Sequence, residues 1–306
     1  MDSSLIGYVI LALICVIMLM SILFGLKRGA SKSVFRLIWL LVTGVILWFL
    51  TPVISSWLNS IDISSLGLNI NGPVSKLSDI GVNILNSLNL DEAISQSEAV
   101  KAFAENFPTM ILNVLVFVLG FWVLKILLYP IWAIIASRCF DKKKRELKAY
   151  KRKVKNLKKR GVPVDEDDMP TGLEISGKNR FGGMLVGIVM GFVICVATLS
   201  PIVGLNTIYQ KANANLVTQN EAGEEVPYLP TVIDEATQEY LNSYENSVAS
   251  KVAKYTGISF FSNLVFNGLA TVNVGGEKIY LANEVDNGIY LYNKYTALSN
   301  FMNNKE

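Results

Sequence analysis

The chain has 306 residues, of which 51% are hydrophobic and 17% are charged, and its mean hydropathy is +0.39. Soluble domains carry about 25% charged residues, so this composition indicates a membrane protein. The absence of histidine excludes Ser-His-Asp and Cys-His triads and every zinc site that uses histidine. The three cysteines, Cys15, Cys139 and Cys195, form no CxxC pair. We therefore expect a protein that is not an enzyme and that holds no cofactor or metal.

Four apolar stretches are long enough to cross a bilayer, which needs about 20 residues in a helix. They are predicted at residues 5–26, 37–57, 109–136 and 182–205. The first is not typical of a cleavable signal peptide, because Lys27 and Arg28 follow the apolar run and the run is too long. The sequence thus predicts an all-α integral membrane protein, with a four-span membrane domain over residues 1–205 in the lipid bilayer.

The loops between the predicted spans differ in charge. The loop after the first span carries four basic and no acidic residues, and residues 137–181 carry 15 basic and 7 acidic residues. The opposite loop, residues 57–107, has 2 basic and 6 acidic residues, and residues 204–306 have 6 and 11. Basic loops stay in the cytoplasm, so this pattern predicts both termini outside and the two basic loops inside.

Residues 138–160 form a basic run with a thin apolar stripe at Phe140, Leu147, Tyr150, Val154 and Leu157. Such a helix can lie on anionic lipid or bind a partner helix. The alternative, which we favour, is a cytoplasmic extension of the third span whose solvated charges enforce the topology. A nucleic-acid partner is not expected, since the run has one tyrosine and no binding motif. The acidic group at residues 165–168 lacks the spacing of a calcium loop.

Lys125 is the single basic residue within the predicted spans, which contain no Asp or Glu. An intramembrane charge is by default a functional candidate, but Lys125 lies near the inner edge of the third span, where lysine can snorkel. No carboxylate or histidine accompanies it to relay protons. Ion-coupled transport is therefore disfavoured, while uncoupled passage stays open.

The fourth span carries glycines at every fourth position: Gly183, Gly187 and Gly191. This spacing makes a flat stripe on which another helix can pack closely. The partner is either a helix of the same chain, the preferred interpretation, or a second copy in a homo-oligomer. Gly25 and Gly29 flank Lys27-Arg28 and are expected to serve the reversal between the first two spans.

Two short segments resemble motifs of the colicin V production (CvpA) family of bacterial membrane proteins. Gly25, Arg28 and Gly29 match the family's G-x-x-RG turn, and Arg180, Gly182 and Gly183 match its DR-x-x-G entry to the last helix. The likeness covers residues 1 to about 205. Asn179 stands where the family often has Asp, and the basic insertion of residues 138–178 and the tail of about 100 residues are additions to the family's short core.

The resemblance implies an integral protein of the bacterial cytoplasmic membrane, associated with bacteriocin (toxin) production or export and with envelope maintenance. We expect a non-enzymatic scaffold or assembly partner that acts through the glycine stripe and the tail, on an envelope protein or on a second copy. The alternative is a transporter or channel component that passes a small solute or ion along Lys125 and the glycines. Some relatives carry a serine protease domain, whose histidine-dependent chemistry is excluded here.

The remaining segments predict short elements outside the membrane. Residues 74–88 and 91–107 are expected to be amphipathic helices, the second ending before Pro108. Residues 206–230 have the composition of a linker. Beyond them, residues 231–306 are predicted to form a small extracytoplasmic α+β region that leans on the membrane domain. Its elements are a helix at 231–255, a short apolar segment at 258–270, a β-hairpin at 271–281 around Gly275-Gly276 and a helix at 282–303.

Overall fold

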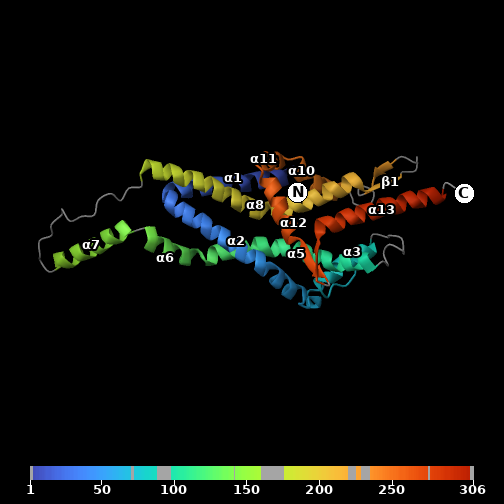
Figure 1. Cartoon of the computed structure of the whole chain (residues 1–306), viewed down its shortest axis with the longest axis horizontal. Helices are drawn as coiled ribbons and strands as arrows, with labels where there is room; N and C mark the ends of the chain where they lie inside the picture. The colour runs from blue at the N-terminus through green and yellow to red at the C-terminus, as the bar shows by residue number, and fades with distance from the viewer. Residues whose placement is uncertain are drawn as a thin grey trace. The chain divides into compact units, whose positions relative to one another are not determined.

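Long helices dominate the chain and extend beyond the predicted apolar stretches. The computed structural model describes residues 3–69, 72–87, 98–140, 142–159, 176–219, 225–228, 235–274 and 276–303. Its first seven α-helices are α1 (Ser3–Arg28), α2 (Ala30–Asn59), α3 (Leu77–Ser87), α5 (Glu98–Leu127), α6 (Tyr129–Phe140), α7 (Lys142–Lys159) and α8 (Gly177–Asn215), with a 3₁₀ turn, η1, at Ser64–Leu66 (Figure 1). The tail adds α10 (Glu235–Glu245), α11 (Val248–Tyr255), α12 (Ile258–Leu269) and α13 (Leu281–Asn303).

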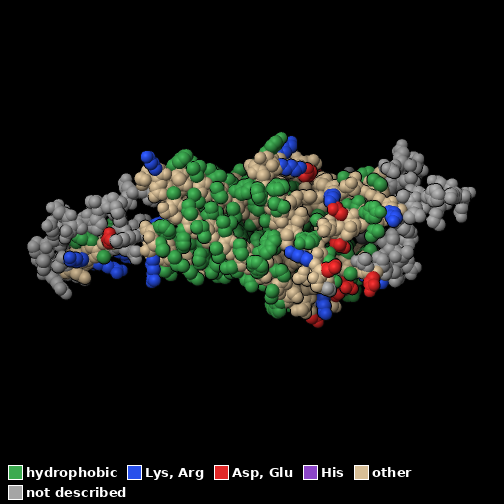
Figure 2. Space-filling model, viewed as in Figure 1, with side chains coloured by type: hydrophobic (Ala, Val, Ile, Leu, Met, Phe, Trp, Pro, Cys, Tyr) green, Lys and Arg blue, Asp and Glu red, His purple; other side chains and the backbone are tan. Residues whose placement is uncertain are grey.

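Four of these helices are long and apolar enough to cross a membrane, at Leu5–Arg28, Ala30–Asn59, Val100–Leu127 and Gly177–Asn215. Large apolar side chains are exposed along them, and Figure 2 shows such side chains covering much of the surface over the spans. Phe49 is 73% exposed and Leu119 is 67% exposed. Water-soluble proteins rarely expose apolar patches of this extent, whereas lipid accepts them. The predicted class, a helical multi-pass membrane protein, agrees with this architecture.

The second and third spans differ in their bounds from the sequence prediction. Helix α2 begins at Ala30 instead of residue 37, because one residue, Gly29, is enough to end α1. Its φ is +79° and its N–H donates to the Gly25 carbonyl at 3.0 Å, as in a glycine that ends a helix. The predicted third span at 109–136 is divided, since α5 ends at Leu127 and α6 begins at Tyr129 with Pro130 in its first turn, where proline is tolerated.

The described chain forms two compact units. Unit 1 contains residues 1–15, 45–121 and 194–306, and unit 2 contains residues 16–44 and 122–193. Each of the four spans contributes a part to both units. The predicted domain boundary at residue 205 therefore does not coincide with a boundary between compact units, because the tail belongs to the same unit as the neighbouring parts of the spans.

The tail of unit 1 contains the predicted hairpin. Strands β3 (Thr271–Val274) and β4 (Glu277–Tyr280) pair antiparallel, with Val274 opposite Glu277, and Gly276 has a φ of +91° that suits the turn. The base of the hairpin is closed by the Leu281 N–H, which donates to the Ala270 carbonyl at 2.9 Å. Helix α13 lies where the sequence predicts a helix, and the apolar segment at 258–270, for which no type of element was predicted, forms α12.

Two predictions for the tail are wrong in detail. The expected helix at 231–255 is broken, because the Ser247 hydroxyl accepts a hydrogen bond from the Ser250 N–H at 3.1 Å and starts α11 as an N-cap. The linker predicted from residue 206 begins instead with ten residues of α8. A short antiparallel pair follows, β1 (Val217–Gln219) with β2 (Glu225–Pro227).

The tail packs onto the spans within unit 1. The Asn113 amide of α5 donates to the Thr271 carbonyl at 2.7 Å, and the Ser262 hydroxyl of α12 donates to the Val196 carbonyl of α8 at 3.1 Å. The Phe266 ring lies directly on Gly204 of α8, where a methyl group would overlap it. The tail thus leans on the spans through a polar and apolar interface, as expected from its small size.

The region before α5 also departs from the prediction. Helix α3 covers most of the predicted 74–88 helix, and residues 91–97 of the second predicted helix lie outside the described residues. Residues 98–107 belong to α5, which continues through Pro108 instead of ending before it. Proline removes the N–H that would bond to the Ala104 carbonyl, and Gly81 of α3 packs against that same carbonyl. Helix α3 therefore packs against α5 at the point where Pro108 interrupts its hydrogen bonds, and α5 continues beyond that point.

Candidate functional site

In unit 2, α1 and α8 cross with their backbones in direct contact. The three glycines of the α8 stripe all face α1 there. A methyl group at Gly183 would overlap the Gly25 carbonyl oxygen, one at Gly187 would lie 3.1 Å from the Ile22 Cα, and one at Gly191 would lie 2.8 Å from the Met18 sulfur. This is the close approach that small residues permit between membrane helices. The stripe is occupied by a helix of the same chain, so it does not line an open path at these positions.

The same crossing holds the turn between α1 and α2. The Ala30 N–H, the first of α2, donates to Asn179 Oδ1 of α8 at 2.6 Å. Gly29 lies against the same amide, since a methyl group there would be 3.0 Å from both its oxygen and its nitrogen. A methyl group at Gly182 would lie 3.0 Å from the Ala30 Cβ. The two segments that resemble family motifs therefore meet in space, although they are about 150 residues apart in the chain.

Not every residue of the two motifs takes part in this contact. Arg28 turns toward aromatic side chains, with its guanidinium carbon 4.9 Å from the Phe24 ring centroid and 5.3 Å from the Trp132 ring centroid. Arg180 is exposed on α8. The glycines and Asn179 thus shape the crossing, while the two arginines project from it.

A cation–π cluster lies beside the turn in unit 2. The Arg36 guanidinium of α2 is 4.6 Å from the Trp132 ring centroid and 5.2 Å from the Tyr129 centroid, so two arginines share one indole. The Lys125 Nζ atom lies 4.0 Å from the Trp122 ring centroid. Lys125 therefore rests on an aromatic neighbour near the end of α5.

The basic helix α7 contains three of the five predicted stripe residues among its described side chains, while Phe140 is exposed at the end of α6 and the Leu157 side chain lies outside the description. Leu147, Tyr150 and Val154 are half-buried, whereas Lys148, Lys151, Arg152, Lys153 and Lys155 are exposed. The acidic group at residues 165–168 lies outside the described residues. Both interpretations of the basic run, lipid contact and solvated extension, are compatible with this pattern.

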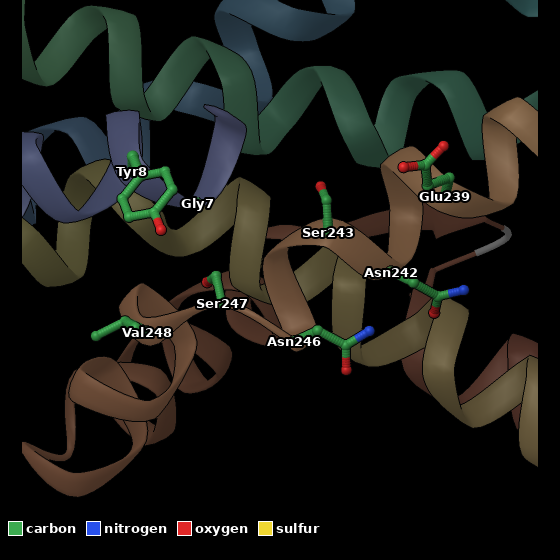
Figure 3. Close-up of a pocket in the computed structure, with 8 residues that line it drawn as sticks. All are labelled: Gly7, Tyr8, Glu239, Asn242, Ser243, Asn246, Ser247 and Val248. Carbon is green, nitrogen blue, oxygen red and sulfur yellow. The ribbon is translucent and has the colours of Figure 1, made fainter. Parts of the chain in front are cut away.

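Unit 1 has a cavity of about 510 Å³, lined mostly by residues with polar side chains, between the start of α1 and the α10–α11 corner (Figure 3). Figure 3 shows Tyr8 on one side and Glu239, Asn242, Ser243 and Asn246 along the other. Gly7 allows this close packing, since a methyl group there would press on the Ser247 side chain. The sequence carried no signal for this cavity, because its two sides come from opposite ends of the chain.

The contacts at these sites are close helix packing and cation–π interactions. Among the described residues, no group of three or more histidine, cysteine, aspartate or glutamate side chains could hold a metal ion. The sequence singled out Arg28 and Lys125 but missed Arg36, Trp132 and Tyr129. Aromatic residues near the end of a span, beside a basic turn, were the one local signal for the cluster.

These features define the class of protein: a helical chain with four candidate membrane spans and a tail packed on them. No protein-family model matches the chain, and neither a curated protein nor a solved structure shows significant similarity to it.

Proposed function

We propose that this chain is a non-enzymatic scaffold of the colicin V production type in the bacterial cytoplasmic membrane. Its role would be to hold an assembly for bacteriocin production or export, or for envelope maintenance, with both termini outside. The observation that carries the proposal is the contact between the two motif segments. Gly25 and Gly29 pack on Gly183 and Asn179, as expected if the two motifs serve one structural purpose.

The direction of the chain in the membrane rests on charge. The turn at Lys27–Arg36 and the basic helix α7 carry the positive charge that favours the cytoplasmic side. The hairpin and α10–α13 would then lie outside, where they present a surface to an envelope partner. Helix α7 would contribute contacts with anionic lipid at about 1 kcal/mol per basic residue near the surface. A second copy would have to use a face other than the glycine stripe, which α1 occupies.

Complementation tests the family assignment directly. The chain is expressed in a bacterium that makes colicin V and lacks its own colicin V production protein, and secreted bacteriocin and envelope integrity are measured. Wild type should restore production, and Gly183→Leu should abolish it, because leucine would drive α8 away from Gly25. Gly44→Leu is the matched control, since nothing lies within 4 Å of a methyl group at Gly44. If the wild type does not restore production, the family assignment is refuted. If Gly183→Leu restores it fully, the crossing of α1 and α8 is not required for function.

A partner can be sought through the tail. A photo-crosslinking amino acid at Tyr255, which is 92% exposed, should give a discrete adduct with an envelope protein. The same amino acid at Ile258, which is 2% exposed, is the buried control and should give none. Equal labelling of many proteins from both positions would argue against a specific partner.

The alternative, a transporter or channel component, has less support from the geometry. The glycines expected to line its path are covered by α1, and Lys125 rests on Trp122. Reconstitution in vesicles, followed by measurement of ion and small-solute flux, separates the two functions. Flux well above that of empty vesicles would overturn the scaffold proposal.

A further inference from the structure

We propose that Arg28, Arg36 and Lys125 form a binding site for the phosphate of an anionic phospholipid headgroup, with Trp132 at its centre. This site goes beyond the scaffold role and is distinct from the basic helix α7. It lies within unit 2, where the end of α1, the start of α2 and the α5–α6 junction come together.

The two arginines share one aromatic neighbour, Trp132. Their guanidinium carbons lie 5.3 and 4.6 Å from the Trp132 ring centroid, so the two carbons are less than 10 Å apart. Arginine stays protonated in proteins, and both side chains are half-buried. Two fixed positive charges in such surroundings repel each other and lose hydration, which an opposing charge offsets.

The part of the chain that the structure describes supplies no such opposing charge. Within the described residues of unit 2, Glu146 on α7 is the single acidic side chain, and neither arginine nor Lys125 forms a salt bridge there. The ion pairs that the structure does contain among described residues, Lys211 with Asp286 and Lys254 with Glu245, are in unit 1. Among the described residues, the cluster therefore carries a net positive charge.

Trp132 adds an independent observation. The residue is 6% exposed, and its indole N–H is buried with no acceptor among the described residues. A buried donor without a partner costs about 1–3 kcal/mol and is uncommon in native proteins. A phosphate oxygen between the arginines would give that N–H an acceptor and would suit the planar donors of each guanidinium.

The surroundings favour a lipid over free phosphate. Trp122, Tyr129 and Trp132 are aromatic residues of the kind that gathers at headgroup level. Large apolar side chains lie next to the cations on the same helices, including Leu23, Phe24, Ile126 and Leu127, and all four are exposed. A headgroup held by the cations would place its acyl chains along these side chains, whereas inorganic phosphate would use none of them.

Binding is measured on the purified full-length protein by native mass spectrometry and by thermal stabilisation in detergent. The probes are phosphatidylglycerol, zwitterionic phosphatidylcholine and inorganic phosphate. Wild type should bind phosphatidylglycerol with clearly higher affinity than phosphatidylcholine. The double variant Arg28→Gln/Arg36→Gln should lose roughly thirtyfold in affinity for phosphatidylglycerol, if each charge contributes about 1 kcal/mol. Lys27→Gln is the matched control, because Lys27 is exposed beside Arg28, and it should keep the preference.

Two further variants keep the test decisive if the double variant does not fold. Trp132→Phe keeps an aromatic side chain and removes the indole N–H. It should therefore weaken phosphatidylglycerol binding without unfolding the protein. Arg28→Lys/Arg36→Lys retains both charges and should keep a preference for the anionic lipid. Equal binding of both lipids by wild type, or unchanged binding by Trp132→Phe, would overturn the site. Stabilisation by inorganic phosphate equal to that by phosphatidylglycerol would overturn the lipid assignment. None of these readouts depends on complementation, so the scaffold proposal and the lipid site can fail separately.

Discussion

One oxygen atom of α8 completes the first turn of α2. The residue before α2 is Gly29, which has no side chain with which to cap the helix. Asn179 Oδ1 takes that role from a distant part of the chain by accepting from the Ala30 N–H. Because the oxygen matters and the amide nitrogen does not, an aspartate should serve equally well.

We therefore expect Asn179→Asp and Asn179→Leu to differ sharply. Asp should match or exceed wild-type stability, by about 0.3–1 kcal/mol, because its negative charge also lies at a helix N-terminus. Leu should cost about 1 kcal/mol through loss of the cap. Thermal unfolding in detergent, followed by circular dichroism, measures both. Equal destabilisation by the two variants would show that the hydrogen bond to Ala30 is unimportant.

A second residue-scale feature joins α8, α10 and α11 in unit 1. Burial acts to raise the pKa of the Glu245 carboxyl, but hydrogen bonds from Lys254 and Asn206 and the charge of Lys254 outweigh it. The pKa of Glu245 therefore lies below its ordinary value of 4.5. A carboxyl with a depressed pKa stabilises the folded state above its unfolded pKa, and this contribution is lost as the pH falls through the folded pKa.

The prediction is a pH-dependent difference between wild type and Glu245→Gln. Wild type should have the higher Tm at pH 7, and the difference should shrink as the pH falls below about 4.5, the ordinary pKa. Because Glu245 is partly exposed, the difference should be small and should decrease at high salt. Glu277→Gln, on exposed β4, is the control and should show no such trend. A constant Tm difference from pH 7 to pH 3 would contradict the role of the carboxylate.

At the scale of elements, α12 is the contact through which the tail docks on the spans. Its Phe266 ring is 1% exposed and fills the space above Gly204, and Trp48 of α2 lies on Gly268 of the same helix. Small residues thus let aromatic rings approach a backbone on both sides of the interface. The apolar 258–270 segment is too short to cross a membrane, and its helix packs on the spans instead.

Phe266→Ala should open a cavity in this interface. We expect a loss of roughly 3–5 kcal/mol, as for other buried phenylalanines, and faster amide hydrogen exchange in α12 and the β3–β4 hairpin. Phe260→Ala changes the same residue type on the same helix at a 64% exposed position, and it should stay close to wild type. A comparable loss from both variants would mean that α12 does not dock through Phe266.

Local sequence patterns predicted most elements, and they failed where a single residue or a distant contact determines whether a helix ends or continues. Apolar runs, the Gly275-Gly276 turn and the helix at 282–303 needed only local information. The break between α10 and α11 depends on one serine acting as a cap within an otherwise helical pattern. The passage of α5 through Pro108 was missed, and Gly81 of α3 meets the carbonyl that the proline leaves without a hydrogen bond. No local rule indicates that contact.

At the scale of the whole molecule, the proposed topology has a direct test. In a variant without the three native cysteines, a cysteine at Tyr255 should react with an impermeant reagent in intact cells, and one at Ser176 should react only after permeabilisation. Both positions are exposed, so their reactivity reports the side of the membrane. Ser243 suits this purpose less well, because it is half-buried and lines the cavity of unit 1. The reverse labelling pattern would invert the topology.

The candidate site shows where sequence reasoning stops. Arg28 and the glycines were recognisable from short motifs, because their spacing alone indicates a turn and a packing stripe. The pairing of Arg28 with Arg36 around Trp132 was not, since three segments meet there and Trp132 is about 100 residues from either arginine. Likewise, the spacing of the glycines predicts a packing face but does not identify α1 as the helix that packs on it.

The crossing of α1 and α8 has a consequence for biogenesis. Its two halves lie about 160 residues apart, so α1 leaves the ribosome long before its packing partner exists. At roughly 5–20 residues per second, this delay amounts to roughly ten to thirty seconds of synthesis. During that time the surface around Ser21 and Gly25 has no α8 to pack on, and the first two spans wait in the membrane as an unfinished hairpin. The first two spans are therefore synthesised well before the fourth span is available to pack on α1.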